Sequence, residues 1–226
     1  VTVFVARKLG DVAFGQISFA QAFTSYFALG SNFGFTTYAV KAVASEREKT
    51  SQYAGNVALL RVCLALVLFT LLWSLLSPLE LSHLKTRLVL LYGLALFPMA
   101  VDFTWLFSAH ERMELRSLVE VTRSTLYGII IFAILSRFPT PATVGAANLS
   151  VTVIASALCV WLCLRFFTGL RLTMDREFWS PFLRAALPIG LSLTMVRIYY
   201  NVDTIMLSFM KGDAAVGWYN AAYKII

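Results

Sequence analysis

The chain alternates between long apolar blocks and short polar connections. Six complete apolar blocks lie at residues 14–40, 55–77, 86–107, 117–136, 142–165 and 181–208. Residues 1–5 have the pattern of the last turn of a helix, and a further helix begins near residue 214. Each complete block has about twenty residues or more, which lets an α-helix cross a hydrocarbon core about 30 Å thick. The pattern predicts an all-α, polytopic transmembrane helix bundle, and the two incomplete helices predict a fragment of a longer protein.

Composition favours the same class. Hydrophobic residues make up 59% of the chain and charged residues 14%, with a mean hydropathy of +0.74, whereas about 25% of residues are charged in an average globular protein. The net charge of +7 is spread over the connections, where it suits membrane topology and anionic headgroups rather than nucleic acid. The three cysteines lie in apolar blocks and the two histidines in connections, without the spacing of metal ligands. We therefore expect neither a metal nor another cofactor.

Basic residues are distributed unevenly between two alternating sets of connections. One set holds nine of them: Lys41, Arg47, Lys49, Arg112, Arg116, Arg165, Arg171, Arg176 and Arg184. The other set holds six: Arg7, Lys8, Lys85, Arg87, Arg137 and Lys211. Because lysine and arginine are enriched in cytoplasmic loops, the first set is predicted to lie in the cytoplasm.

Polar residues form a stripe along the first complete block. They are spaced by three, four and seven positions, which places them on one side of a helix: Ser18, Gln21, Ser25, Asn32 and Thr36. Lipid would not tolerate such a stripe. Two interpretations stay open, namely that the stripe hydrogen-bonds to neighbouring helices, helped by close contact at Gly30 and Gly34, or that it lines a water-filled cavity.

Ionisable residues also lie inside the blocks or near their ends: Arg61, Asp102, Glu120, Arg123, Arg197 and Asp203. A charge at the centre of a membrane helix costs about 2.5–3.5 kcal/mol, so such groups are usually paired or turned toward an aqueous cavity. Arg197 and Asp203 are separated by about 120° around their helix and need partners from elsewhere. Arg197 therefore either faces a wet cavity or forms a buried ion pair, with Asp102 or Asp203, that fixes helix packing.

A second group of charges stands at the start of the block at 117–136. Arg116, Glu120 and Arg123 are four and three residues apart, so they form a ladder along one helix face. Because the ladder occupies the first two turns, close to water and headgroups, its spacing favours a structural role.

Four segments resemble sequence motifs of bacterial polysaccharide exporters. They are ARKLGDVAFGQISFAQAF at 6–23, NFGFTTYAVKAVA at 32–44, VDFTWLFSAHERME at 101–114 and VDTIMLSFMKGDAAVGWYNAAYKII at 202–226. Their order and spacing are similar to those of the Wzx-like lipid-linked oligosaccharide flippases of the multidrug/oligosaccharidyl-lipid/polysaccharide exporter superfamily. Two positions depart from the family pattern: the loop has GDVAFG where a Pro-Glu pair is common, and Ser108 stands where Gln is frequent. Neither departure removes a charged residue.

The resemblance implies a MATE-like fold of two pseudo-symmetric lobes around a central cavity. Residues 1–165 would form the first lobe, from the end of helix 1 to helix 6, residues 166–180 a cytoplasmic linker, and residues 181–226 helix 7 and the beginning of helix 8. It also implies a protein that is not an enzyme but a flippase of the bacterial or archaeal cytoplasmic membrane. The flippase would move an undecaprenyl-diphosphate-linked oligosaccharide from the cytoplasmic to the outer leaflet by alternating access, for O-antigen or another surface polysaccharide. Expected partners are this glycan, membrane lipids, and polysaccharide polymerase or assembly proteins.

On this hypothesis, the guanidinium groups of Arg197 and Arg61 would bind the diphosphate through bidentate, charge-assisted hydrogen bonds. The candidates for contacts to sugar hydroxyls are Tyr200, Asn201, Gln21, Ser25 and Asn32. The candidates for binding a coupling proton or cation are Asp102, Asp203 and Glu120.

Other functions stay in view. A multidrug antiporter, which exchanges organic cations for sodium or protons, would favour carboxylates and aromatic residues in its cavity, and the basic residues inside the blocks argue against it. A lipid II flippase is a near neighbour that the sequence does not exclude. A membrane enzyme or scaffold is disfavoured, because the longest connection has about fifteen residues and holds no phosphate-binding glycine loop, metal-ligand spacing or nucleophile–base set.

Overall fold

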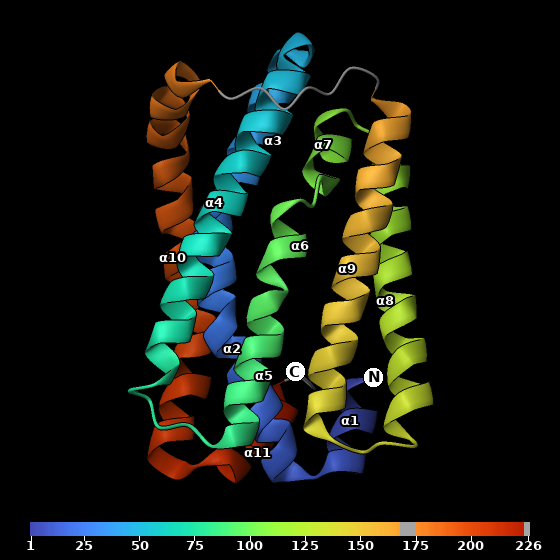
Figure 1. Ribbon diagram of the computed structural model, residues 1–226, viewed down its shortest axis with the longest axis vertical. Coiled ribbons are helices and arrows are strands. Elements are labelled where there is room, and N and C mark those ends of the chain that lie inside the picture. The colour runs from blue at the N-terminus through green and yellow to red at the C-terminus, as the bar shows by residue number, and fades with distance from the viewer. Residues whose placement is uncertain (168–174, 224–226) are drawn as a thin grey trace.

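The computed structural model describes residues 1–167 and 175–223 as a bundle of helices that run between two ends (Figure 1). In chain order the helices are α1 Thr2–Leu9, α2 Asp11–Asn32, α3 Phe35–Ser45, α4 Thr50–Leu76, α5 His83–Leu94, α6 Leu96–Ala100, α7 Thr104–Ala109, α8 Met113–Leu135, α9 Pro141–Phe166, α10 Arg176–Lys211 and α11 Asp213–Tyr223, with a 3-10 turn at Arg47–Lys49. The described residues contain no strand. The predicted all-α class is confirmed.

Four helical segments of the described chain are long and apolar enough to cross a membrane: Arg47–Leu76, Met113–Leu135, Pro141–Phe166 and Glu177–Lys211. Large apolar side chains stand exposed on these helices, among them Trp73 on α4, Phe132 on α8 and Trp161 on α9. A wide exposed apolar surface marks a contact with another apolar phase, and the hydrocarbon of a bilayer requires such a surface on a helix whose backbone is fully hydrogen-bonded. The structure is thus a polytopic membrane bundle.

The connections between helices alternate between the two ends of the bundle (Figure 1). At one end, which we call the Arg47 end, α3, α7 and α9 finish and α4, α8 and α10 begin. At the other, the Asp11 end, α4, α8 and α10 finish and α2, α5, α9 and α11 begin. The more basic set of connections is therefore grouped at the Arg47 end, which the positive-inside rule predicts to face the cytoplasm.

Two of the predicted helices are interrupted. The block at 14–40 divides into α2 and α3 at Phe33 and Gly34, whose φ angles are +29° and +76°. Positive φ cannot continue a right-handed helix, and glycine adopts it without a Cβ clash. The block at 86–107 divides into α5, α6 and α7. Pro98 lacks the N–H that would bond to the carbonyl of Leu94, and α5 ends at Leu94. The apolar pattern does not predict either break, because most residues at the breaks are apolar.

Helix boundaries also differ from the sequence-based prediction at both ends of the chain. Helix α1 continues to Leu9, beyond the predicted 1–5, so Gly10 alone separates it from α2. Helix α10 begins at Arg176, inside the predicted linker 166–180. Residues 168–174 of that linker and residues 224–226 lie outside the described residues, and the division into two lobes stays a prediction.

The two largest clusters of buried apolar residues lie one toward each end of the bundle. The cluster toward the Arg47 end includes Phe35, Phe107 and Phe182. The cluster toward the Asp11 end includes Leu72 and Ile131, both fully buried. Because lipid is as apolar as these side chains, close van der Waals packing stabilises such clusters within a membrane. These clusters hold the helices that line the polar interior described next.

Candidate functional site

Two adjoining polar cavities lie within the bundle. The first has a volume of about 400 Å³ and is lined by α2, α3, α4, α8 and the segment from α6 to α7. The second has a volume of about 460 Å³ and is lined by α2, α4, α5, α6, α9 and α10. Asn32, Arg61 and Met99 line both. The two cavities therefore adjoin at Arg61.

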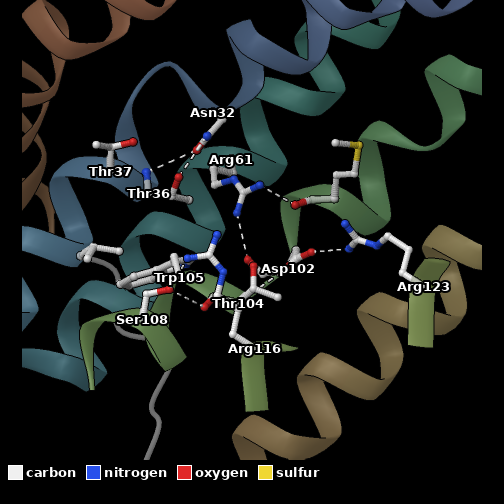
Figure 2. A pocket seen from close by; sticks show the side chains of 12 residues that line it. Asn32, Thr36, Thr37, Arg61, Asp102, Thr104, Trp105, Ser108, Arg116 and Arg123 are labelled. Atoms are coloured by element: carbon white, nitrogen blue, oxygen red, sulfur yellow. Dashed lines mark hydrogen bonds and ion pairs between the residues drawn. The ribbon is translucent and has the colours of Figure 1, made fainter. Parts of the chain in front are cut away.

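The helix breaks build the first cavity. At the break between α2 and α3, the Asn32 amide donates to Thr36 Oγ1 at 3.0 Å, and Asn32 Oδ1 accepts the N–H of Thr36 at 3.3 Å. At the break between α6 and α7, Asp102 Oδ1 accepts the N–H of Thr104 at 2.9 Å. The backbone groups at a helix end have no partner within the helix, so side chains satisfy them. Each break thereby draws polar side chains into an otherwise apolar bundle (Figure 2).

Arg61 is held between the cavities by neutral groups. Its side chain, on α4, is almost fully buried. Its terminal N–H groups donate to the main-chain carbonyl oxygens of Met99 and Asp102, the latter at 3.1 Å. Its Nε atom is buried and has no hydrogen-bond partner among the described residues. Arg61 therefore makes no hydrogen bond to a carboxylate among the described residues, and it keeps a free donor where the two cavities meet.

Asp102 is the single carboxylate among the described residues that line the first cavity. Its Oδ2 atom accepts a hydrogen bond from Arg123 Nη2 at 2.7 Å, and Arg123 Nη1 lies 3.8 Å from Glu120 Oε2. Arg116 Nη1 donates to the hydroxyl oxygen of Ser108 at 2.8 Å. Three guanidinium groups and one carboxylate thus face the cavity (Figure 2), and three minus one gives its described lining a net charge of +2.

The second cavity is lined by two guanidinium groups, of Arg61 and Arg197, and by more uncharged polar side chains than the first. Helix α2 supplies most of its polar groups: Gln21, Thr24, Ser25, Ser31 and Asn32. Facing helices add Tyr92, Asn148 and Arg197. The Gln21 amide donates to the Tyr92 hydroxyl at 3.0 Å, which ties α2 to α5. Amide and hydroxyl groups that both donate and accept hydrogen bonds therefore dominate this wall.

The residues predicted to bind substrate are only partly brought together. Five of the seven line the cavities, with Gln21, Ser25 and Arg197 in the second and Asn32 and Arg61 in both. Tyr200 and Asn201 are not among the lining residues of either cavity. The Asn201 amide instead donates to the main-chain carbonyl of Arg197, one turn earlier, at 3.0 Å. Tyr200 is exposed on α10.

The three coupling-ion candidates lie apart from one another. Asp102 faces the first cavity in its pair with Arg123. The Glu120 side chain is about half exposed, and Asp203 accepts a hydrogen bond from the Tyr219 hydroxyl at 2.9 Å. The ion pair considered for Arg197 is not formed in this structure, since Asp102 pairs with Arg123 and Asp203 bonds to Tyr219.

Several lining residues escaped the sequence analysis. In the first cavity these include Arg116, Thr37 and Ser108, and in the second Tyr92 and Asn148. For Arg116 the signal was present, because it is seven residues from Arg123 and so lies on the same helix face. The ladder interpretation placed this face near headgroups, whereas both arginines line the first cavity. Tyr92 and Asn148 are single polar residues in apolar blocks and gave no pattern.

His110 lies at the Arg47 end, between α7 and α8. Its Nε2 atom is 2.9 Å from the hydroxyl oxygen of Thr50. Partial burial lowers the pKa of His110, and the nearby charges of Arg47 and Arg112 lower it further. The neutral imidazole is therefore favoured in the folded protein.

Residues 1–226 match a protein family described as "Polysaccharide biosynthesis protein". The chain belongs to this family. Two similar relatives carry the name "Putative O-antigen transporter". The one from Shigella dysenteriae is 27% identical over 239 residues, covering 100% of this chain and 57% of the relative. The one from Escherichia coli strain K12 is 22% identical over 232 residues, covering 98% and 54%.

This family member spans about half the length of the curated relatives that it matches. No solved structure matches the chain significantly. With four membrane-capable helices in its described residues and bacterial O-antigen transporters as relatives, it is a multi-pass protein of the bacterial cytoplasmic membrane.

Proposed function

We propose that the protein translocates an anionic, lipid-linked oligosaccharide from the cytoplasmic to the outer leaflet, for O-antigen or another surface polysaccharide. The carrier would be undecaprenyl diphosphate, and the protein would act by alternating access as a transporter rather than as an enzyme. Family membership and the names of the two relatives support the class of substrate. Membrane lipids and polysaccharide polymerase or assembly proteins would be its partners.

The observation that carries this proposal is the charge of the first cavity. Three guanidinium groups face it against one carboxylate, and Arg61 and Arg116 are held by neutral oxygens alone among the described residues. Guanidinium groups bind phosphate oxygens through paired, charge-assisted hydrogen bonds. A diphosphate esterified at both ends carries about two negative charges and would balance the +2 of this lining.

The second cavity suits the glycan. Hydroxyl and amide groups of α2 face it together with Tyr92 and Asn148, and such groups exchange hydrogen bonds with sugar hydroxyls in either direction. Gln21, Ser25 and Asn32 are therefore proposed as sugar contacts, with Arg197 as a further phosphate contact from α10. Tyr200 and Asn201 keep a lesser place in the proposal, since they lie one turn beyond Arg197.

The carboxylates receive different roles. Asp102 is engaged by Arg123 and by the N–H of Thr104, so we assign it to positioning Arg123 at the cavity rather than to binding a coupling ion. Asp203 and Glu120 are partly accessible and stay the candidates for a coupling proton or cation. A cation antiporter is disfavoured, because an organic cation would enter a lining that is already positive.

The test uses full-length protein in proteoliposomes and measures the transfer of a labelled undecaprenyl-diphosphate oligosaccharide between leaflets. Arg116→Gln is expected to slow transfer tenfold or more, because a hydrogen bond to a charged group contributes about 1.5–3 kcal/mol and 1.4 kcal/mol is about tenfold. The matched control is Arg87→Gln, an exposed arginine of α5 that lines neither cavity. Equal transfer by both variants would overturn the proposal. Transfer of labelled lipid II at the same rate would instead assign the peptidoglycan precursor as the substrate.

A further inference from the structure

Helices α2 and α11 begin with the same short sequence in the same backbone conformation. The two segments are GDVAFG at 10–15 and GDAAVG at 212–217, identical at four of six positions. Gly10 has φ and ψ angles of 83° and 174°, and Gly212 has angles of 82° and −179°. Both glycines adopt a region that residues with a Cβ rarely enter. The chain therefore contains an internal repeat whose copies lie 202 positions apart, from 10 to 212.

The two copies pack against each other at the Asp11 end, backbone to backbone. A Cβ added to Gly15 would lie 1.8 Å from the carbonyl oxygen of Asp213, and one added to Gly217 would lie 2.2 Å from the carbonyl oxygen of Asp11. Each glycine thus touches the residue that opens the partner helix. The contact is reciprocal, as expected where two equivalent elements meet across a two-fold axis.

The hydrogen bonds repeat this reciprocity. Trp218, which follows Gly217, donates its indole N–H to Asp11 Oδ2 at 3.0 Å. Gln16, which follows Gly15, donates its amide to Asp213 Oδ2 at 3.1 Å. Each aspartate therefore accepts from the residue that occupies the equivalent place in the other copy.

Lys85 of α5 binds Asp213 and so joins α5 to this contact. Lys85 Nζ lies 2.5 Å from Asp213 Oδ1 and 3.1 Å from the Ser208 hydroxyl oxygen. It also stands 4.9 Å from the centre of the Phe19 ring, where the aromatic face attracts a cation. The Lys85 and Asp213 side chains are 13% and 17% exposed, so the ion pair is largely withdrawn from solvent.

We infer that the starts of α2 and α11 form a latch that closes the Asp11 end of the cavity path and separates during transport. The polar wall of α2 begins at Gln21, six residues or about 9 Å beyond Gly15, and continues to the first cavity near α7 at the Arg47 end. The cavities therefore lie to one side of the latch. The separation step, but not the closed contact, rests on the proposed transport function.

The parts of the latch suit a contact that opens. Glycine backbones meet at the centre of the contact, and water can replace each hydrogen bond when the helices part. Trp218 is 65% exposed, so its hydrogen bond to Asp11 lies at the rim.

A thiol behind the latch reports whether it is closed. Ser18 is buried on α2, one turn beyond Gly15 and on the same side of the helix. In the full-length protein with every native cysteine replaced by alanine, Ser18→Cys would be labelled with a membrane-impermeant maleimide. We expect slow labelling in this background. Gly217→Ala should raise the labelling rate tenfold or more, because its methyl group cannot fit beside Asp11, and Trp218→Phe should raise it about threefold.

Matched controls separate this effect from general loosening. Gly128→Ala adds the same methyl group on α8, where the nearest atom, of Val1, would be 3.7 Å away. Trp179→Phe removes an indole hydrogen bond at the Arg47 end, where the Trp179 indole donates to Asn56 at 3.0 Å. Neither control should change labelling of the Ser18→Cys thiol. If Gly217→Ala does not fold, Trp218→Phe, altered at an exposed side chain, still decides the question.

Two results would overturn the latch. One is rapid labelling of the Ser18→Cys thiol before any latch residue is changed. The other is unchanged labelling both in Trp218→Phe and in a folded Gly217→Ala variant. Labelling needs no substrate, so it fails or succeeds separately from the proposed function. If the latch variants raise labelling but Arg116→Gln transports normally, the latch is retained and the proposed function is rejected. The reverse combination would retain the function and reject the latch.

Discussion

The two ends of the bundle hold α10 and α11 against the other helices in different ways. At the Arg47 end, α10 packs through aromatic rings, with Tyr53 and Phe178 4.7 Å apart and Tyr38 and Phe182 5.5 Å apart, measured between ring centres. Buried Asn56 adds hydrogen bonds from Trp179 and from the N–H of Asp175. At the Asp11 end, α11 meets α2 through glycine backbones and two reciprocal hydrogen bonds, and the Lys85–Asp213 ion pair joins α11 to α5.

This difference bears on the free energy needed to separate the helices at each end. Separating closely packed aromatic rings loses many van der Waals contacts at once, in lipid as in water. A hydrogen bond that water can replace contributes only about 0.5–1.5 kcal/mol. Phe19 and Phe209 also pack at the Asp11 end, with ring centres 5.8 Å apart. The contact between α2 and α11 itself depends mainly on groups that water can satisfy, and the aromatic Arg47 end is suited to hold α10 as a hinge.

The largest effect on stability is expected at the aromatic end. Phe182→Ala should lower the free energy of unfolding by about 3–5 kcal/mol, because Phe182 is 2% exposed and its removal leaves a cavity. Denaturant unfolding of the full-length protein in detergent measures this loss. The comparison predicts that labelling of the Ser18→Cys thiol stays slow in the folded fraction of this variant. Fast labelling would show that the two ends are not independent.

A smaller effect is expected from the ion pair of the latch. Lys85→Met should lower the free energy of unfolding by about 2–3 kcal/mol, since it leaves the Asp213 carboxylate largely buried without its cation. Adding Asp213→Leu should recover part of this loss, because no unpaired charge remains. The same unfolding experiment gives the coupling between the two changes. Strictly additive losses would mean that the pair makes no net contribution to the latch.

The smallest effect concerns pH at the Arg47 end. His110 has a lowered pKa in the folded state, whereas the unfolded chain has the ordinary value near about 6.5. Its contribution to stability is therefore present above about pH 6.5 and is lost as the pH falls below that value, where the unfolded state binds the proton more readily. His110→Gln should flatten the pH dependence of the melting temperature between about pH 5 and 7. The control is His83→Gln, at the Asp11 end, which should leave this pH dependence unchanged. An unchanged pH dependence in His110→Gln would contradict the role given to His110.

The apolar blocks predicted the order of the long helices, but not their number, because two blocks divide into shorter helices. Lipid accepts only segments whose backbone is satisfied internally, so a run such as 55–77 has one stable form, and α4 covers it. The breaks at Phe33 and at Ala95 were missed, because positive φ angles and the missing N–H of Pro98 leave the apolar pattern unchanged. The repeat of GDVAFG in GDAAVG was present in the sequence, but nothing in either copy said that the other would be its partner.

By itself, the sequence determined that this chain is an all-α membrane bundle. It also determined which residues form the polar stripe along α2 and which arginines lie inside the apolar blocks. Those properties depend on the local length and period of apolar residues. Only the tertiary structure decided that Asp102 pairs with Arg123 rather than Arg197, that Arg61 stands between two cavities, and that Asp11 and Asp213 exchange partners across two glycines. Such pairings join residues on different helices, and their choice depends on which helix faces meet when the whole bundle packs.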